Sequence, residues 1–462
     1  MIPASRRILS VAGQTVRTAL RLRVFVLAAV AILATLLGLP FLIRHDGTAR
    51  MLAEVTLTYS LVAIVVLLGG LSLWLSCSTI AGEIASGELS LVSLKPVRRW
   101  QLWLGKWLGV LTIDAILLGC GLTLVGTLLL VRSRQLPPDQ QQEFRSAILV
   151  ARASHREPPV DLRSDIELLV GRRMQQEGSE GLDPKLVREQ MAAYARARHE
   201  TVGPSFRRVW AVSVKPPHSE SSPRTLHLRI RFHAANLSRQ VTYPTVWIVG
   251  DTLSGRYERF EKHLTAGVTH EFPISESLVS PRGELIVECE NRGDASLLFR
   301  FEDGLEVLQP AGGFFPNLLR AGAILLCWLA LITAAGLAAS SLFSVPTAWV
   351  VCVGLLYMGC SGETLTEIVE EGTVFGVEHG HGDVEPHLID RVAVPAFGAI
   401  HRVVDGILSV SPVTRLGTGR AIGWDQLARA FVDVVLVGAG TFSAISMLVF
   451  QRRQLGLPST TP

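Results

Sequence analysis

The stretch from Glu363 to Asp390 concentrates side chains that could bind a metal ion. It holds eight carboxylates and three histidines but no lysine or arginine. His379 and His381 could supply two imidazoles, and Asp383 or Glu385 an oxygen, to a divalent cation such as zinc. A solvated acidic loop explains the same composition without a metal, and three nearby glycines favour that loop. The metal site is therefore the alternative interpretation.

The chain carries no complete motif for an enzyme active site. The nucleotide-binding pattern G-x-x-x-x-G-K-[ST] is absent, because Gly105-Lys106 is followed by Trp107. Two His-Glu pairs, His199-Glu200 and His270-Glu271, begin like a zinc-protease motif, but no second histidine follows at the required spacing, and there is no G-x-S-x-G elbow. We therefore predict no enzymatic activity, no catalytic residue and no cofactor in this chain.

The segment 81–110 has the properties of a contact element for another protein. Arg98 and Arg99 present rigid guanidinium forks that pair with carboxylates, and Gly105 and Gly109, four residues apart, allow close helix contact. The basic residues alone are explained by the positive-inside bias of membrane proteins. Their order with an acidic residue, a proline and the glycines favours the contact element. Its predicted members are Glu83, Gly87, Lys95, Pro96, Arg98, Arg99 and Lys106.

This order resembles the cytoplasmic loop of ABC transporter permeases of the type-2 export class. The shared features are an acidic residue, a Ser-Gly pair, a leucine-rich turn, a Lys-Pro-Val-x-Arg-Trp run and a Gly-Lys-x-x-Gly element. In this chain they are Glu83, Ser86-Gly87, Leu89 to Leu94, Lys95 to Trp100 and Gly105 to Gly109. The chain end from Phe450 to Leu455 is similar to the aromatic-Arg-Arg-x-Leu ending of the family. Glu88, where the family often has Thr, departs from the pattern.

The resemblance implies a membrane-spanning permease subunit of an ATP-driven exporter of an unidentified substrate. It implies a separate ABC ATPase subunit that holds ATP and Mg, and a second permease copy, in a homodimer or a heterodimer. The seven residues of the contact element would couple to that ATPase. The resemblance also implies an elbow helix before the first span and re-entrant gate helices at Pro386 to Leu408. It covers neither the large polar region nor the acidic loop.

Composition independently indicates a membrane protein. Of 462 residues, 48% are hydrophobic and only 18% charged, and the mean hydropathy is +0.36. A helix of about 20 apolar residues crosses the bilayer core. Six segments approach this length and predict six transmembrane helices. They are Val24 to Ile43, Val55 to Thr79, Trp107 to Val131, the two halves of the uncharged stretch from Ala321 to Gly362, and Phe431 to Phe450.

Asp114 and Asp433 interrupt the third and the last of these segments. A carboxylate facing lipid is costly, so each should point inward, along a gate or substrate path, or lie near an interface. Their positions towards the span ends favour solvation at the interface. The substrate path is the alternative.

The distribution of Lys and Arg predicts the orientation. Basic residues near span ends are retained in the cytoplasm, and they collect before the first span, between spans two and three, and after the last span. We expect an integral protein of the cytoplasmic (inner) membrane with both termini in the cytoplasm. A net charge of +4 without basic-aromatic clusters argues against nucleic acid as a partner and leaves the lipid bilayer as the surrounding phase.

The large polar region is predicted to be an extracytoplasmic α+β domain. Residues 139–200 have a helical composition, and from Leu226 to Phe232 apolar and polar residues alternate as in a half-buried strand. Further strand-like runs predict an antiparallel β-sandwich. Its aromatic residues Tyr243, Trp247 and Tyr257 either line a binding face or, as is commoner at this spacing, form the core. The domain itself is either a recognition module or a passive spacer.

These predictions give an α-helical polytopic membrane protein with six transmembrane helices and an inserted α+β domain that contains a β-sandwich-like part. The expected segments are an interfacial helix (1–23), helices 1–3 with a coupling loop (24–131, loop 80–106), the extracytoplasmic domain (132–317, helical 139–200, β-rich 224–308), helices 4–5 (318–362), an acidic loop with gate helices (363–430), and helix 6 with a cytoplasmic tail (431–462).

Two other functional classes remain open. The first is a membrane-anchored sensor or assembly protein whose extracytoplasmic domain binds a partner. The second is a metal-dependent membrane hydrolase built on the histidines after the fifth span. An adjacent reading frame that encodes an ATPase would favour the permease over both.

Overall fold

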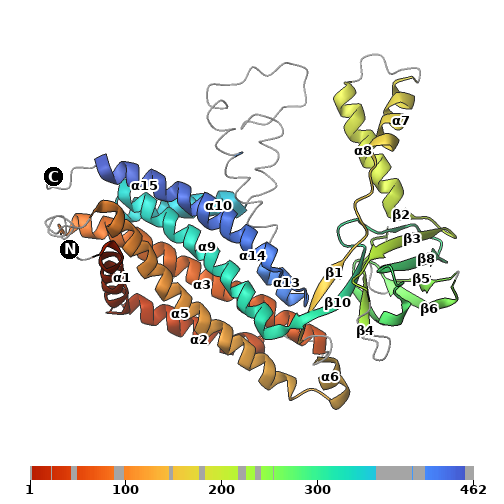
Figure 1. Cartoon of the computed structure of the whole chain (residues 1–462), viewed down its shortest axis with the longest axis horizontal. Coiled ribbons are helices and arrows are strands. Elements are labelled where there is room, and N and C mark those ends of the chain that lie inside the picture. The colour runs from red at the N-terminus through yellow and green to blue at the C-terminus, as the bar shows by residue number, and fades with distance from the viewer. Residues whose placement is uncertain are drawn as a thin grey trace. The chain divides into compact units, whose positions relative to one another are not determined.

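The computed structural model divides into a helical unit and a β-rich unit (Figure 1). The helical unit comprises Met1–Val150 and Gly313–Pro462, and the β-rich unit comprises Ala151–Gly312. The residues that the structure describes are 3–21, 23–42, 49–87, 98–144, 149–175, 183–216, 225–234, 241–252, 254–360, 398 and 411–452. The compact β-rich unit is shorter than the predicted domain 132–317, because the third apolar helix continues to Ser133 and the next one starts at Phe314.

The described part of the helical unit consists almost entirely of helices. They are α1 (Ala4–Arg21), α2 (Arg23–Leu42), α3 (Ala49–Ala85), α5 (Arg99–Ser133), α6 (Pro138–Glu143), α9 (Phe314–Leu342), α10 (Val345–Cys360), α13 (Pro412–Gly417), α14 (Trp424–Ala430), the π-helix η3 (Phe431–Ala439) and α15 (Gly440–Arg452). All six predicted apolar segments are therefore mainly helical.

Four described stretches are long and apolar enough to cross a membrane. They are Leu52–Ala85, Arg99–Ser133, Phe314–Leu342 and Trp424–Val449. The first predicted span would be a fifth only as a bent pair with α1, at an angle of 69°, and the helix at Val345–Gly359 is shorter than a full span. The helical polytopic architecture is thus supported by four or five candidate spans, and the number six stays a prediction.

Helix α1 packs directly on α5 at the two glycines of the predicted contact element. A Cβ atom at Gly105 would lie 2.6 Å from Val11 Cβ, and one at Gly109 would lie 2.7 Å from Thr15 Cβ. These distances are too short for a side chain, so the spacing of the glycines does allow close helix contact. The helix they receive is the predicted interfacial helix, which buries Ala12 against the bundle.

Several chain segments meet at this end of the helical unit. Ile80 of α3, Trp103 of α5 and Leu337 of α9 belong to one apolar cluster, against which Val11 of α1 and Phe442 of α15 pack. The flanks that carry the predicted cytoplasmic basic residues are therefore gathered at one end of the bundle. At the other end, Gly126 of α5 lies against the first turns of α9, and there the chain leaves for the β-rich unit and returns.

The β-rich unit contains two four-stranded sheets, of order β1-β10-β4-β7 and β3-β8-β5-β6, and a two-stranded sheet, β2-β9, within the described residues. The strands are β1 (Val150–His155), β2 (Thr201–Val202), β3 (Arg207–Ser213), β4 (Thr225–Ile230), β5 (Thr242–Asp251), β6 (Arg256–Thr265), β7 (His270–Ser275), β8 (Glu284–Asn291), β9 (Leu297–Leu298) and β10 (Leu305–Gly313), and two helices, α7 (Arg163–Met174) and α8 (Pro184–Glu200), precede most of them.

The two larger sheets share one apolar core, as in a sandwich. Leu228 of β4 is fully buried in the same cluster as Trp247 of β5, whose ring stacks on Trp210 of β3 with centroids 6.0 Å apart. The predicted alternation is present, because His227 and Arg229 lie on the opposite face of β4 from Leu228. Of the three aromatic candidates for a binding face, Tyr243 and Trp247 are core residues and only Tyr257 is exposed.

The predicted boundaries inside this region were partly wrong. Strand β1 interrupts the stretch 139–200 that was expected to be helical, and β2 and β3 precede the β-rich range 224–308. Strand β1 has no apolar alternation of its own. It exists because it joins the edge of a sheet beside β10, a partner about 150 residues away in sequence.

The two His-Glu pairs have structural partners in the β-rich unit. Glu271 forms ion pairs with two arginines on the outer face of the sheet β1-β10-β4-β7. Its Oε1 lies 2.5 Å from Arg152 Nη1 and its Oε2 lies 3.1 Å from Arg229 Nε, and all three side chains are buried. The carboxylate of Glu200 accepts a hydrogen bond of 2.9 Å from the backbone amide of Phe301. Buried charges need such pairing, so both glutamates serve the fold.

The glycine contact between α1 and α5 predicts an asymmetric effect of alanine. Gly105→Ala places a methyl group within 2.6 Å of Val11 Cβ, and overpacking of this kind costs about 1–3 kcal/mol. Gly119→Ala on the same helix meets nothing within 4 Å and is the matched control. We expect thermal unfolding of the purified protein to shift downwards for Gly105→Ala and to stay level or rise for Gly119→Ala. Equal melting temperatures would contradict the contact.

Candidate functional site

The end of α3 and the start of α5 are joined by a partly buried ion pair. Lys106 Nζ lies 2.5 Å from Glu83 Oε1 and donates a second hydrogen bond of 3.3 Å to the carbonyl oxygen of Thr79. The Lys106 side chain is 2% exposed and that of Glu83 is 29% exposed. Two of the predicted coupling residues thus pair with each other, and only the glutamate keeps a surface that another protein could contact.

The remaining described members of the contact element mark the ends of the two helices. Gly87 closes α3 with a φ of +74°, a left-handed conformation that glycine adopts without strain, and its amide donates to the carbonyl of Ile84. Arg98 precedes α5, where its backbone amide donates to Gln101 Oε1 at 3.1 Å. The Arg98 side chain is exposed and that of Arg99 is half-buried. Lys95 and Pro96 lie outside the described residues.

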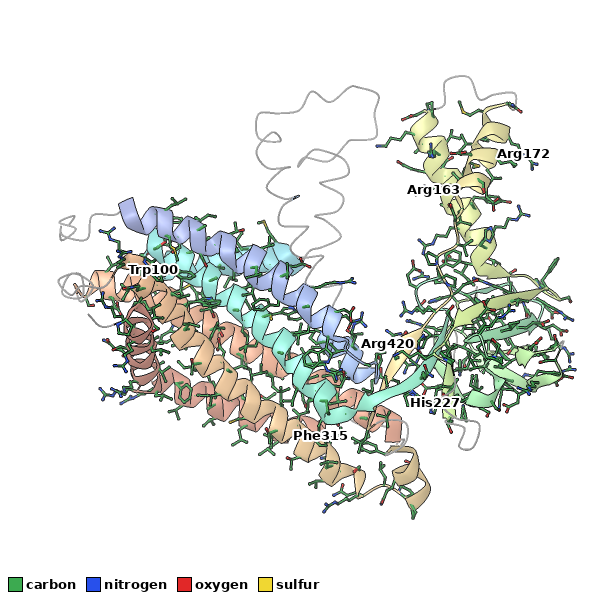
Figure 2. All side chains as sticks on the ribbon, viewed as in Figure 1. Trp100, Arg163, Arg172, His227, Phe315 and Arg420 are labelled. Carbon is green, nitrogen blue, oxygen red and sulfur yellow. The ribbon has the colours of Figure 1, made fainter. Side chains whose placement is uncertain are left out.

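Tryptophans pack behind this element. Trp103 and Trp107 stack with ring centroids 6.3 Å apart, and Trp107 Nε1 donates a hydrogen bond of 3.0 Å to the carbonyl of Ala330 on α9. Trp103 is almost fully buried, so it packs inside the bundle. Trp100, by contrast, keeps an exposed edge near Arg99 in sequence (Figure 2). The stacked pair of Trp103 and Trp107 therefore connects α5 to α9.

The structure places Asp114 inside the helix packing. Its side chain is fully buried, and Oδ1 accepts a hydrogen bond of 2.7 Å from Ser72 of α3. The second oxygen, Oδ2, has no hydrogen-bond partner among the described residues. Solvation at a membrane interface, the favoured interpretation from sequence, is therefore wrong for Asp114. The reason is that α5 begins at Arg99, eight residues before the predicted span, which moves Asp114 to mid-helix.

Asp433 has a different environment. It is exposed in the π-helical segment η3. Asp425 precedes it by two turns and Arg429 by one turn, and Arg429 Nη2 lies 4.0 Å from Asp425 Oδ2. Asp433 is exposed whereas Asp114 is buried, so the two carboxylates have different environments. Its position on a charged stripe leaves the interface interpretation open for Asp433.

A polar clamp at the opposite end of the bundle was missed by sequence reasoning. Asn317 of α9 donates to the carbonyl of Arg420 at 3.0 Å and accepts from the amide of Ile422 at 2.7 Å. Arg320 donates to the carbonyl of Ile422 at 2.7 Å and lies over the ring of Trp424 at 5.1 Å (Figure 2 labels Arg420). The clamp holds the chain between α13 and α14 against α9. Arg320, the last charge before a long uncharged run, was the available signal.

No metal site can be assigned from the described residues, which contain no group of three or more His, Cys, Asp or Glu side chains arranged to hold an ion. The alternative ligands His379 and His381 lie outside the described part of the chain, as do the predicted gate helices except Gly398. Their roles stay predictions.

The comparisons with known proteins give no further guide. No protein-family model, curated protein or solved structure matches this chain.

The Glu83–Lys106 pair can be tested with a double-mutant cycle. The cycle compares the parent protein, Glu83→Gln, Lys106→Met and the double variant. Glu83→Gln leaves a buried ammonium without its carboxylate, whereas the double variant removes both charges. We expect a coupling free energy of about 1–3 kcal/mol, between the values for exposed and buried pairs. Denaturation of the four proteins in the same detergent measures it. Additive effects of the two substitutions would show that the pair contributes nothing.

Proposed function

We propose that the chain is the membrane-spanning permease subunit of an ATP-driven ABC exporter, which moves a substrate of unknown identity with energy from a separate ATPase subunit. The observation that carries the proposal is the packed end formed by α1, the end of α3 and the start of α5. Helices α3 and α5 flank the segment whose residue order resembles the coupling loop of type-2 export permeases, and α1 packs on α5. A push on that segment would reach three helices at once.

The contacts of this end support a mechanical role. Lys106 ties α5 to α3, the glycines tie α5 to α1, and Trp107 ties α5 to α9. Arg98 and Arg99 would pair with carboxylates of the ATPase, since guanidinium groups form bidentate contacts with them. ATP and Mg would be bound by that partner. This chain would supply the contact surface for the ATPase and the path for the substrate.

The proposed topology follows from the same end. With the basic flanks in the cytoplasm, both termini are cytoplasmic and the β-rich unit, attached at the other end of the bundle, is extracytoplasmic. Large exposed apolar residues such as Val350, Leu436 and Leu448 would face lipid or the second permease copy. Six spans require that α2 and α10 also cross. Helix α10, with 16 residues, is about 24 Å long and would need a locally thin bilayer.

The first test is copurification. A tagged chain expressed with its neighbouring genes and extracted in a mild detergent should retain a protein with Walker motifs, in a complex with two permease copies. Size-exclusion chromatography with mass spectrometry measures this. A stable monomer that binds no ATPase under these conditions would contradict the proposal and leave the sensor or assembly protein as the better hypothesis.

The second test reverses one charge of the contact. Arg99→Glu should weaken the binding of the ATPase by about 2–5 kcal/mol, the cost of breaking a buried charged contact. It should also abolish the stimulation of ATP hydrolysis in that partner. Arg134→Glu, an exposed arginine just beyond the other end of α5, is the matched control and should leave both unchanged. Membrane insertion should be the same for both variants. Full ATPase stimulation by Arg99→Glu would rule out this contact.

A further inference from the structure

The helices α7 and α8 pack on each other over a thin apolar seam. No residue of α7 is buried, and in α8 only Val187, Ala195 and Glu200 are. Large apolar side chains on these helices, Leu186 and Tyr194 among them, are more than half exposed. The pair therefore has surface that the described remainder of the β-rich unit leaves uncovered.

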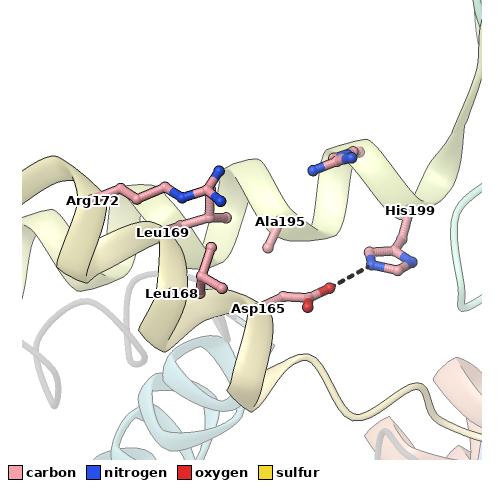
Figure 3. Close-up of a pocket in the computed structure, with 7 residues that line it drawn as sticks. Asp165, Leu168, Leu169, Arg172, Ala195 and His199 are labelled. Atoms are coloured by element: carbon pink, nitrogen blue, oxygen red, sulfur yellow. Dashed lines mark hydrogen bonds and ion pairs between the residues drawn. The ribbon is translucent and has the colours of Figure 1, made fainter.

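A cavity of about 350 Å³ opens between the two helices (Figure 3). Its lining residues are Asp165, Leu168, Leu169 and Arg172 of α7 and Ala195, Arg198 and His199 of α8. On each helix these positions are three or four residues apart, so each set forms one stripe on one helical face. The small side chain of Ala195 leaves the space between the stripes open.

The charges of the cavity are unbalanced. His199 Nε2 lies 3.0 Å from Asp165 Oδ2, so the single carboxylate of the lining already has a partner. Among the described residues, neither Arg172 nor Arg198 has an acidic partner, and both side chains are exposed. Two guanidinium groups therefore remain available to a ligand at this cavity. Guanidinium groups bind oxyanions through paired N–H donors, so an oxyanion is the ligand group that this charge favours.

The rest of the lining is apolar. In Figure 3, Leu168, Leu169 and Ala195 lie between Arg172 and the Asp165–His199 pair. Leu168 is 53% exposed. An apolar group bound beside the arginines would remove this leucine from water, which favours a ligand with two parts.

We propose that this cavity, lined by Arg172 and Arg198 with Leu168 between the helices, binds a small molecule that carries an oxyanion next to an apolar group. A phosphate monoester with an aromatic or short alkyl substituent has this chemistry. The same chemistry is found in a phosphatidic acid head group with its first chain carbons and in soluble phosphorylated metabolites. The site is independent of the proposed transport function.

The test is calorimetric titration of the full chain, in lipid nanodiscs, with phenyl phosphate. We expect saturable binding at one site per chain, at least about tenfold tighter than inorganic phosphate, because phosphate lacks the apolar group. The double variant Arg172→Gln, Arg198→Gln should weaken phenyl phosphate binding by about tenfold or more. Leu168→Ser should weaken phenyl phosphate but leave inorganic phosphate unchanged.

The matched control changes two exposed arginines of the same helices that do not line the cavity, Arg163→Gln with Arg188→Gln (Arg163 and Arg172 are labelled in Figure 2). The affinity of this control variant for phenyl phosphate should stay within about twofold of that of the parent protein, which separates a local site from a general effect of charge. No saturable binding to the parent protein, or equal losses in the two double variants, would overturn the proposal. Circular dichroism verifies that each variant retains its fold.

A competition experiment distinguishes the two sources of the ligand. Dihexanoyl phosphatidic acid that displaces phenyl phosphate, when dihexanoyl phosphatidylcholine does not, would support a lipid head group. Displacement by soluble sugar phosphates but not by the short-chain lipid would support a metabolite. Displacement by the zwitterionic lipid as effectively as by phosphatidic acid would contradict the role of the two arginines.

Discussion

The close approach of α1 to α5 is the constraint on which the proposed coupling end depends. At Gly105 and Gly109 the helix backbones come so near that even a methyl group would collide with α1. Such a contact is stiff, because packed surfaces resist small displacements far more than solvated loops do. A force applied to the segment before α5 would therefore move α1 together with α5. An amphipathic helix lying against a bundle needs this kind of attachment to act as part of it.

Polar groups inside the apolar helices fix how α3 and α5 lie against each other. The Glu83–Lys106 pair and the Ser72–Asp114 hydrogen bond join the same two helices at two heights, about 12–16 Å apart along their axes. A shift by one residue would separate both sets of partners and leave buried charges unpaired, which costs far more than a lost apolar contact. The pairs therefore select one register. Apolar packing alone would discriminate less between neighbouring registers.

Sequence patterns anticipated what local spacing determines and missed what distant partners determine. Hydrophobic length located the apolar helices, period-two alternation located β4, and the spacing of Gly105 and Gly109 anticipated a tight contact. Strand β1 was missed because its strand character comes from pairing with β10. The burial of Asp114 and the internal partner of Lys106 depend on residues of another helix, Ser72 and Glu83, which no single-sequence pattern connects. The α7–α8 cavity likewise requires two helices to be placed side by side.

The most direct test of the central proposal is site-specific photo-crosslinking in the membrane. A photoreactive phenylalanine analogue replaces Trp100, the exposed aromatic residue next to Arg99 at the start of α5, and in a second protein it replaces Arg134, just beyond the other end of the helix. If the contact element binds an ATPase, irradiation joins position 100, and not position 134, to a protein with Walker motifs, and the yield changes when ATP is added. A nucleotide-binding protein captured at position 134, or none captured at position 100, would contradict the account.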